Sequence, residues 1–420
     1  MRGMRGLCPL LAARLVRSGH ASASRHYRVW ACGANQMGQL GLGDRVGRQV
    51  PTPIPELDGK KIVSIGCTGY FGSALTEDGS VFCWGSGQFE GRTQSVPVPT
   101  EARTLSAKNV TEVHSGRLHQ LYRCSDGRLF VHGDSQFGQT GTGKKGFSAG
   151  ELFPREIMGF DARISTVATG YDHNLAVSED GRVWVWGFNQ DGQLGLGDQK
   201  DRTKPVDLEG LFHKHAEKVF CGPDASAVVT KDGEVYMMGA SDVGQLGQIF
   251  DTAVQATPQR VPLTGKPVCM AIGLSWTFAL MPRGDVWVWG QDRPGFLRLR
   301  GAISNDDIVR DVLPGEDYIT QRMENNNARR DNARGFVPPE RHTGLSGMGV
   351  VDMRSSNSHV LFRTADGYAA VMGRNAMGEV AMPVGASAHV PSFISNLPPG
   401  ERVYAMCAGD CTTFLCTHRE

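Results

Sequence analysis

The sequence predicts an all-β fold, a seven-bladed β-propeller closed by N- and C-terminal strands that share one blade. A glycine that ends a strand-like run recurs seven times, and a second small residue recurs seven times earlier in each unit. The first series has no partner upstream and the second has none downstream, so one unit must be assembled from both ends of the chain. The first series is Gly33, Gly85, Gly133, Gly187, Gly239, Gly290 and Gly373, and the second is Gly66, Gly116, Gly170, Gly222, Gly273, Ser356 and Gly409.

Each unit contains a β-hairpin. In the best-preserved copy, residues 166–198, apolar residues alternate with period two on both sides of Asp180-Gly181. Asp-Gly is typical of a two-residue turn of the primed type, in which both residues take positive φ. The pair recurs at 78–79, 126–127, 232–233 and 366–367, so the sequence predicts the same hairpin in each unit.

A glycine-rich loop follows most hairpins. It reads Gly-Gln-Leu-Gly at 38–41, 192–195 and 244–247, and Gly-Gln-Thr-Gly at 138–141. Such a loop can cradle phosphate when it opens a helix and ends in Lys-Ser or Lys-Thr, and neither condition holds here. We therefore interpret these glycines as structural.

Closure of the ring predicts the positions of the terminal strands. Segments 403–409 and 412–416 are expected to form the two inner strands of the shared blade, and segments 27–32 and 52–57 the two outer ones. A closed ring leaves no terminal repeat to cap, whereas an open solenoid needs polar caps at both ends.

The combined pattern is Val-x-x-Gly-x-x-His, then Asp-Gly-x-Val-x-x-Trp-Gly-x-Asn-x-x-Gly-Gln-Leu-Gly-x-Gly. It resembles the regulator of chromosome condensation repeat family over about residues 27–418. The best-known member exchanges guanine nucleotide on the GTPase Ran and binds chromatin, with an acidic residue after the turn glycine of its third blade and a wedge-like insertion there. Here Arg117 follows Gly116 and loop 133–141 has no wedge, which argues against Ran exchange, and we expect no chromatin partner.

The N-terminal segment is rich in arginine and serine, and the first acidic residue is Asp44. Such a segment looks like a mitochondrial transit peptide, which we place at residues 1–26, with the propeller at 27–420 and a location in the matrix. A secretory signal fits less well because Pro9 and Arg14 interrupt its apolar centre, and an untargeted disordered arm remains an alternative. Without its five arginines the net charge falls from +1 to −4, which argues against indiscriminate binding to nucleic acid.

One interval in the first glycine series is 83 residues long, and it indicates an insertion in the sixth blade at about 292–343. Long insertions in a rigid scaffold are commonly functional or disordered, and both alternatives stay open. If the insertion binds a partner, its arginines are the candidate contacts. They are Arg298, Arg300, Arg329, Arg330 and Arg334, and acids lie among them.

No catalytic set, metal site or cofactor motif emerges from the sequence. The ten cysteines include no Cys-x-x-Cys pair, and we interpret Cys407, Cys411 and Cys416 as core packing. The sequence contains no run of 18 apolar residues, so it predicts no membrane-spanning helix. Recurrent positions are interpreted as structural: the glycines at 66, 116, 170, 222, 273 and 409, the histidines His119, His173 and His359, and the turn acids Asp172, Asp224 and Asp410.

These features predict a non-enzymatic interaction platform that docks a protein or ribonucleoprotein partner. Resemblance to organellar relatives suggests mitochondrial ribosome assembly or RNA processing as the setting. The alternative is a guanine-nucleotide exchange factor for a mitochondrial small or dynamin-like GTPase. Direct RNA binding through residues 329–334 is weakened by the neighbouring acids, so RNA is expected to bind only indirectly or weakly.

Overall fold

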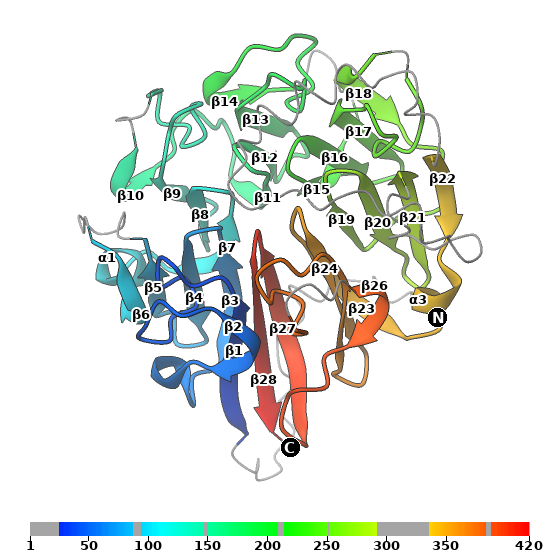
Figure 1. Cartoon of the computed structure of the whole chain (residues 1–420). Coiled ribbons are helices and arrows are strands. Elements are labelled where there is room, and N and C mark those ends of the chain that lie inside the picture. The colour runs from blue at the N-terminus through cyan, green and yellow to red at the C-terminus, as the bar shows by residue number, and fades with distance from the viewer. Residues whose placement is uncertain are drawn as a thin grey trace, which may run out of the picture.

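The structure is a computed structural model that describes residues 25–86, 94–146, 150–208, 214–250, 252–291, 336–383 and 388–419. These residues form seven four-stranded antiparallel sheets, arranged around a ring as the blades of a β-propeller (Figure 1). The predicted fold class is confirmed. We number the blades 1 to 7 along the chain and the strands of each blade from the axis outward.

Blades 2 to 7 each consist of four consecutive strands. Blade 2 contains β3 (Ile62–Cys67), β4 (Phe71–Thr76), β5 (Val81–Gly85) and β6 (Val96–Glu101), and blade 3 contains β7 (Val110–Ser115), β8 (His119–Cys124), β9 (Leu129–Gly133) and β10 (Glu151–Glu156). Blade 4 contains β11 (Ile164–Thr169), β12 (His173–Ser178), β13 (Val183–Gly187) and β14 (Arg202–Asp207), and blade 5 contains β15 (Ala216–Cys221), β16 (Ala225–Thr230), β17 (Val235–Ala240) and β18 (Val254–Arg260). Blade 6 contains β19 (Cys269–Ile272), β20 (Trp276–Leu280), β21 (Val286–Gln291) and β22 (Phe336–Arg341), and blade 7 contains β23 (Val350–Ser355), β24 (His359–Thr364), β25 (Ala369–Gly373) and β26 (Ala388–Phe393).

Blade 1 closes the ring as predicted. From the axis outward it contains β27 (Glu401–Gly409), β28 (Thr412–Arg419), β1 (His26–Gly33) and β2 (Arg48–Pro53). Strands β1 and β28, blue and red in Figure 1, pair over their full lengths from His26 opposite Arg419 to Gly33 opposite Thr412. The predicted outer strand at 52–57 is wrong in its bounds, because Pro55–Leu57 forms a 3₁₀ turn (η1) that buries Leu57.

Short helices also follow two other outer strands. α1 (Arg103–Ser106) follows β6 and α3 (Thr343–Ser346) follows β22, and each buries one leucine, as η1 does. Strand β22 pairs with β21, so the predicted insertion at 292–343 ends earlier than expected. Its remaining residues, 292–335, lie outside the described part of the chain.

The Asp-Gly hairpins exist, but the predicted turn type is wrong. Gly181 N–H donates to Ser178 O at 2.9 Å, and Gly181 has φ of 86° whereas Asp180 does not take positive φ. This is a three-residue loop with one glycine in the left-handed region. The aspartate is used as an acceptor instead, since Ser178 Oγ donates to Asp180 Oδ1 at 2.5 Å.

The core is divided among the seams between adjacent blades. Each hydrophobic cluster joins two neighbouring sheets, as where Trp186 of blade 4 packs with Leu121 and Val131 of blade 3. Every blade therefore depends on both of its neighbours for burial of its apolar faces.

Candidate functional site

The turns between the first and second strands of all seven blades meet at one end of the propeller axis. They surround a cavity of about 60 Å³, to which Thr68, Tyr171, Asn357 and Asp410 contribute from four different blades. Ligand sites for small molecules generally enclose several hundred Å³, roughly 300 or more, so this cavity has room only for a few water-sized molecules. We call this end of the propeller the axial face.

Backbone contacts join the turns of neighbouring blades. Arg117 N–H of blade 3 donates to Tyr171 O of blade 4 at 2.8 Å. A Cβ atom at Gly116 would lie 2.8 Å from Gly170 O, and one at Gly170 would lie 2.5 Å from Gly222 O. Glycine therefore recurs here because the turns of successive blades touch.

Among the described residues, hydrogen bonds of buried histidines bridge three of the seven seams. Nε2 of His119 lies 2.7 Å from Asn174 Oδ1, Nε2 of His173 lies 2.9 Å from Ser226 Oγ, and Nε2 of His359 lies 2.8 Å from Thr413 Oγ1. The hydroxyls of Ser226 and Thr413 already donate to carbonyl groups of the preceding blade. Nε2 must therefore carry the proton in these two seams, and each histidine is a neutral donor to the next blade.

The glutamine of each glycine-rich loop also joins two blades. In three loops its backbone carbonyl oxygen accepts from a buried tryptophan of the next blade, at 2.7 Å for Trp84 to Gln39, 3.0 Å for Trp186 to Gln139 and 2.9 Å for Trp289 to Gln245. In the loop of blade 4 the carbonyl of Gln193 accepts from Ser226 Oγ at 2.8 Å instead. The loops therefore act as structural clamps between blades.

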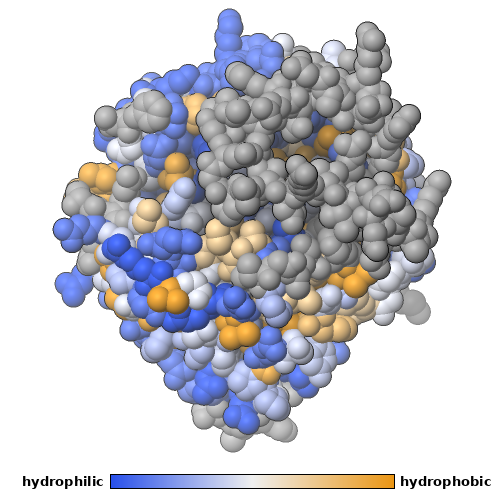
Figure 2. Space-filling model, in the orientation of Figure 1, coloured by the Kyte–Doolittle hydropathy of each residue, from blue (hydrophilic) through white to orange (hydrophobic). Residues whose placement is uncertain are grey.

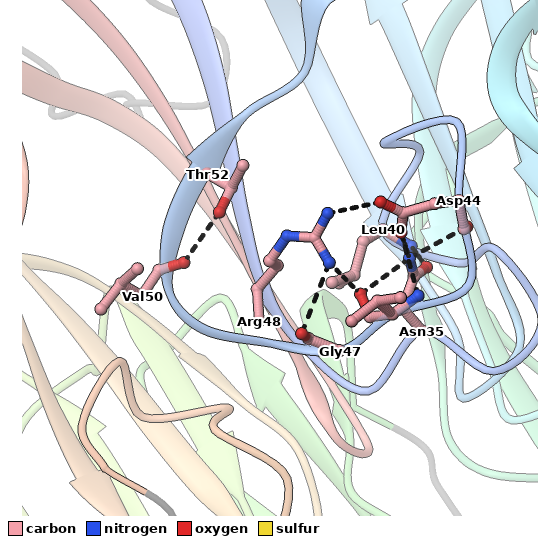
Figure 3. Close-up of polar contacts among 8 residues, drawn as sticks. Asn35, Leu40, Asp44, Gly47, Arg48, Val50 and Thr52 are labelled. Carbon is pink, nitrogen blue, oxygen red and sulfur yellow. Dashed lines mark hydrogen bonds and ion pairs between the residues drawn. The ribbon is translucent and has the colours of Figure 1, made fainter.

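Side chains within the loop hold it in shape, as Figure 3 shows for blade 1. Asn35 Oδ1 accepts from Leu40 N, its Nδ2 donates to Asp44, and Arg48 Nη2 donates to Asp44 Oδ2 at 2.5 Å. The same contacts recur in blade 4 among Asn189, Leu194, Asp198 and Arg202.

A charged cluster, formed by Arg117, Asp172 and Asp410, lies beside the axial cavity. Arg117 of blade 3 donates to Asp172 Oδ2 of blade 4 at 2.5 Å, and Gln139 donates to Asp172 Oδ1 at 3.2 Å. Burial raises the pKa of Asp172 to about 6 despite Arg117, and burial likewise raises the pKa of Asp410 to about 6. Asp172 thus bridges two blades, with both of these partners in blade 3 rather than in its own turn.

Because of its buried histidines, we expect the protein to become less stable in acid. Burial lowers the pKa of His173 to about 3, whereas an unfolded histidine titrates near 6.5. As pH falls below about 6.5, His173 becomes protonated in the unfolded chain but stays neutral in the folded chain. This difference lowers the free energy of unfolding by about 2 kcal/mol at pH 5. Asp172 and Asp410 act in the opposite sense between about pH 6 and pH 4, because the folded chain protonates them first.

A variant isolates the histidine contribution. In His173→Gln the amide can still donate to Ser226 but does not titrate. We expect the loss of unfolding free energy between pH 7.5 and pH 5, measured with urea, to be about 2 kcal/mol smaller than in the unmodified chain. Parallel pH curves for the two proteins would show that His173 carries no such penalty.

The candidate partner contacts Arg298, Arg300, Arg329, Arg330 and Arg334 lie outside the described residues. Within the described ranges, no group of three His, Cys, Asp or Glu side chains is arranged to hold a metal ion. In the same part of the chain no helix has the length and apolar character needed to cross a membrane. Of the three C-terminal cysteines Cys416 is fully buried in the core, whereas Cys407 contacts Cys67, a pairing that local sequence spacing does not reveal.

Comparisons with known proteins agree with this architecture. The RCC1-like domain family matches residues 87–420, and the regulator of chromosome condensation (RCC1) repeat matches residues 28–75 and 62–90. The ultraviolet-B receptor UVR8 of Arabidopsis thaliana is 30% identical over 301 residues, which cover 70% of this chain and 68% of the receptor. The human E3 ubiquitin-protein ligase HERC2 is 29% identical over 279 residues, and this match spans only 6% of its length.

Among solved structures, Prp20p from Saccharomyces cerevisiae, described with its binding properties to Gsp1p and histones, aligns with a TM-score of 0.75. The alignment covers 94% of this chain and 92% of Prp20p at 19% identity, a likeness that concerns the fold alone. The repeat glycines, the closing blade and the family match over most of the sequence lead to one conclusion: the chain belongs to the regulator of chromosome condensation (RCC1) family.

Proposed function

We propose that this chain is a non-enzymatic platform of the mitochondrial matrix that docks a protein or ribonucleoprotein partner on its axial face, in ribosome assembly or RNA processing. Membership of the RCC1 family supports a propeller of the protein-interaction or nucleotide-exchange type. We choose the axial face because the two residues that flank the insertion lie at that end of the propeller. Gln291 and Phe336 are paired with each other at that end of blade 6.

Loops between third and fourth strands lie at the same end as the axial turns. Gln39 in such a loop of blade 1 donates to Gly69 O in the turn of blade 2, and Gln139 of blade 3 reaches Asp172 of blade 4. Phe336 packs against the loop of blade 5, since a Cβ at Gly244 would lie 2.2 Å from its ring. Gln291 and Phe336, which flank the insertion, therefore lie at the same end of the propeller as the axial turns.

The chemistry of this face fits a protein partner better than naked RNA. Among the described residues of this face, Arg117 is paired with Asp172, and Asp410 also lines the turns, so the positive charge of Arg117 is opposed by acids. Exposed apolar groups lie nearby, with Met37 and Tyr70 more than 40% exposed. On the described surface in Figure 2, hydrophobic side chains lie in small groups among hydrophilic ones.

The insertion provides the direct test. Because Gln291 and Phe336 are paired neighbours, a short Gly-Ser linker can replace residues 292–335 without opening blade 6. We expect this variant to keep a cooperative thermal transition and to lose partners recovered by affinity purification from mitochondria. Arg128→Glu, an exposed substitution in a hairpin turn at the opposite end, is the control that should retain them. Retention of all partners by the linker variant would refute docking through the insertion.

The same purification separates the alternatives. Nucleotide exchange remains a candidate because Prp20p, which shares the fold, is described with its binding to Gsp1p. Excess guanine nucleotide should release a GTPase partner, since nucleotide competes with an exchange factor. Nuclease treatment should remove partners that are held through RNA. Partners that stay bound after both treatments support the protein platform.

Mitochondrial import is tested separately, with a reporter protein fused to residues 1–26.

A further inference from the structure

Two thiols meet across the seam where the ring closes. Cys407 lies on β27, the innermost strand of blade 1, and Cys67 lies on β3, the innermost strand of blade 2. Their sulfur atoms are 2.9 Å apart, although the residues are 340 positions apart in the sequence. A disulfide bond is about 2.05 Å long, so the sulfurs need to approach by only about 0.9 Å to bond.

The axial cavity gives this pair access to small oxidants. Cys67 lines the cavity, and Cys407 is partly exposed beside Ala408, which also lines it. A cavity of about 60 Å³ has room for a molecule of the size of hydrogen peroxide. The hydrogen bond from Cys67 and the positive charge of Arg354 lower the pKa of Cys407, whereas burial raises that of Cys67. Cys407 is therefore the better nucleophile of the two.

We propose that Cys67 and Cys407 form an oxidative modification site, at which hydrogen peroxide converts the two thiols into a disulfide that links blade 1 to blade 2. The Cys407 thiolate attacks one peroxide oxygen, the O–O bond breaks, and the departing hydroxide takes up a proton to become water. The sulfur of Cys67 then attacks the resulting sulfenic acid, the S–O bond breaks, and the hydroxyl leaves as water with the proton of the Cys67 thiol. The two sulfurs lose two electrons, and peroxide gains them.

The disulfide would stabilise the seam at which the ring closes. Blade 1 is the only blade built from both ends of the chain, and its inner strand meets blade 2 at this seam. A cross-link between positions 67 and 407 restricts the unfolded chain over most of its length, which stabilises the folded ring. This modification does not depend on the docking function proposed above.

Peptide mapping of the full-length protein tests the proposal. The purified chain is treated with hydrogen peroxide, quenched with catalase, alkylated, and digested with chymotrypsin and Asp-N without reduction. Cleavage at Phe82, Tyr404, Asp410 and Phe414 places Cys67, Cys83, Cys407 and Cys411 on separate peptides. We expect loss of two free thiols, a peptide that joins Cys67 to Cys407, and a thermal midpoint raised by about 5 °C and restored by dithiothreitol.

Single substitutions complete the test. Cys67→Ser and Cys407→Ser should each abolish the cross-link and the thermal shift, whereas Cys83→Ser and Cys411→Ser should retain both. If a substitution at 67 or 407 prevents folding, the peptide map of the unmodified chain still decides. A full count of free thiols after oxidation, or a cross-link that joins other cysteines, would overturn the proposal.

Discussion

We expect removal of residues 412–420 to abolish cooperative folding of the whole propeller rather than of one blade. These residues contain all of β28 (Thr412–Arg419), which pairs with β27 on one side and β1 on the other. Without it β1 and β2 lose their place in blade 1, and the ring opens at two seams.

The energetic reason lies in the side chains of β28. Phe414 and Cys416 are fully buried in the cluster shared with blade 2, and Leu415 is fully buried in the cluster shared with blade 7. Loss of one such large side chain costs about 2–5 kcal/mol, and typical domains are stable by only about 5–15 kcal/mol. Trp30 of β1 also loses its hydrogen bond to Thr417, which is 2.9 Å long. Circular dichroism during heating should therefore show no cooperative transition for the truncated chain.

A circular permutant provides the matched control. His26 and Arg419 are paired partners, so a short linker can join them, with new ends opened within 292–335. This chain keeps every described strand and should unfold cooperatively near the temperature of the unmodified protein. A truncated chain that melts like the permutant would show that closure by β28 is dispensable.

The sequence was sufficient for the number of blades and for closure, because both depend on glycines that the geometry requires. A Cβ at Gly187, for example, would lie 2.4 Å from Asp172 O, so this position is fixed in each unit. The outer strand of blade 1 was misplaced because Arg48–Pro53 is half exposed and carries two prolines, and so has little apolar alternation. The end of the insertion was missed for the same reason, since β22 also contains consecutive prolines and no fully buried residue.

Contacts between residues that are distant in the sequence could not be predicted from the sequence alone. The sequence identified His119, His173 and His359 as recurrent, but only the structure supplies their partners in the next blade. The proximity of Cys67 and Cys407 arises from ring closure alone, and no local spacing encodes it. The recurrence of Asp172 indicates a structural turn acid, but only the structure identifies Arg117 and Gln139 of blade 3 as its partners.

We expect Gly170→Ala to destabilise the protein by about 3 kcal/mol in urea unfolding. Its Cβ would lie 2.1 Å from Cε1 of His173 and 2.5 Å from Gly222 O, so the ring of His173 and the turn of blade 5 would both have to move. The φ angle of Gly170 is not positive, so the expected cost comes from these contacts and not from backbone strain. Gly347→Ala, where the nearest atom would be 3.8 Å away, should change stability by less than about 0.5 kcal/mol.

Blade 7 shows how a side chain can be accommodated at the equivalent position. There Ser356 replaces the glycine, and its hydroxyl lies 3.0 Å from Nδ1 of His359. Nδ1 of His173 has no hydrogen-bond partner among the described residues, so a serine at position 170 can supply one. We therefore expect Gly170→Ser to be less destabilising than Gly170→Ala, although the serine side chain is larger. Equal losses for the two variants would show that contact with Gly222 O, rather than with the histidine, requires glycine in this turn.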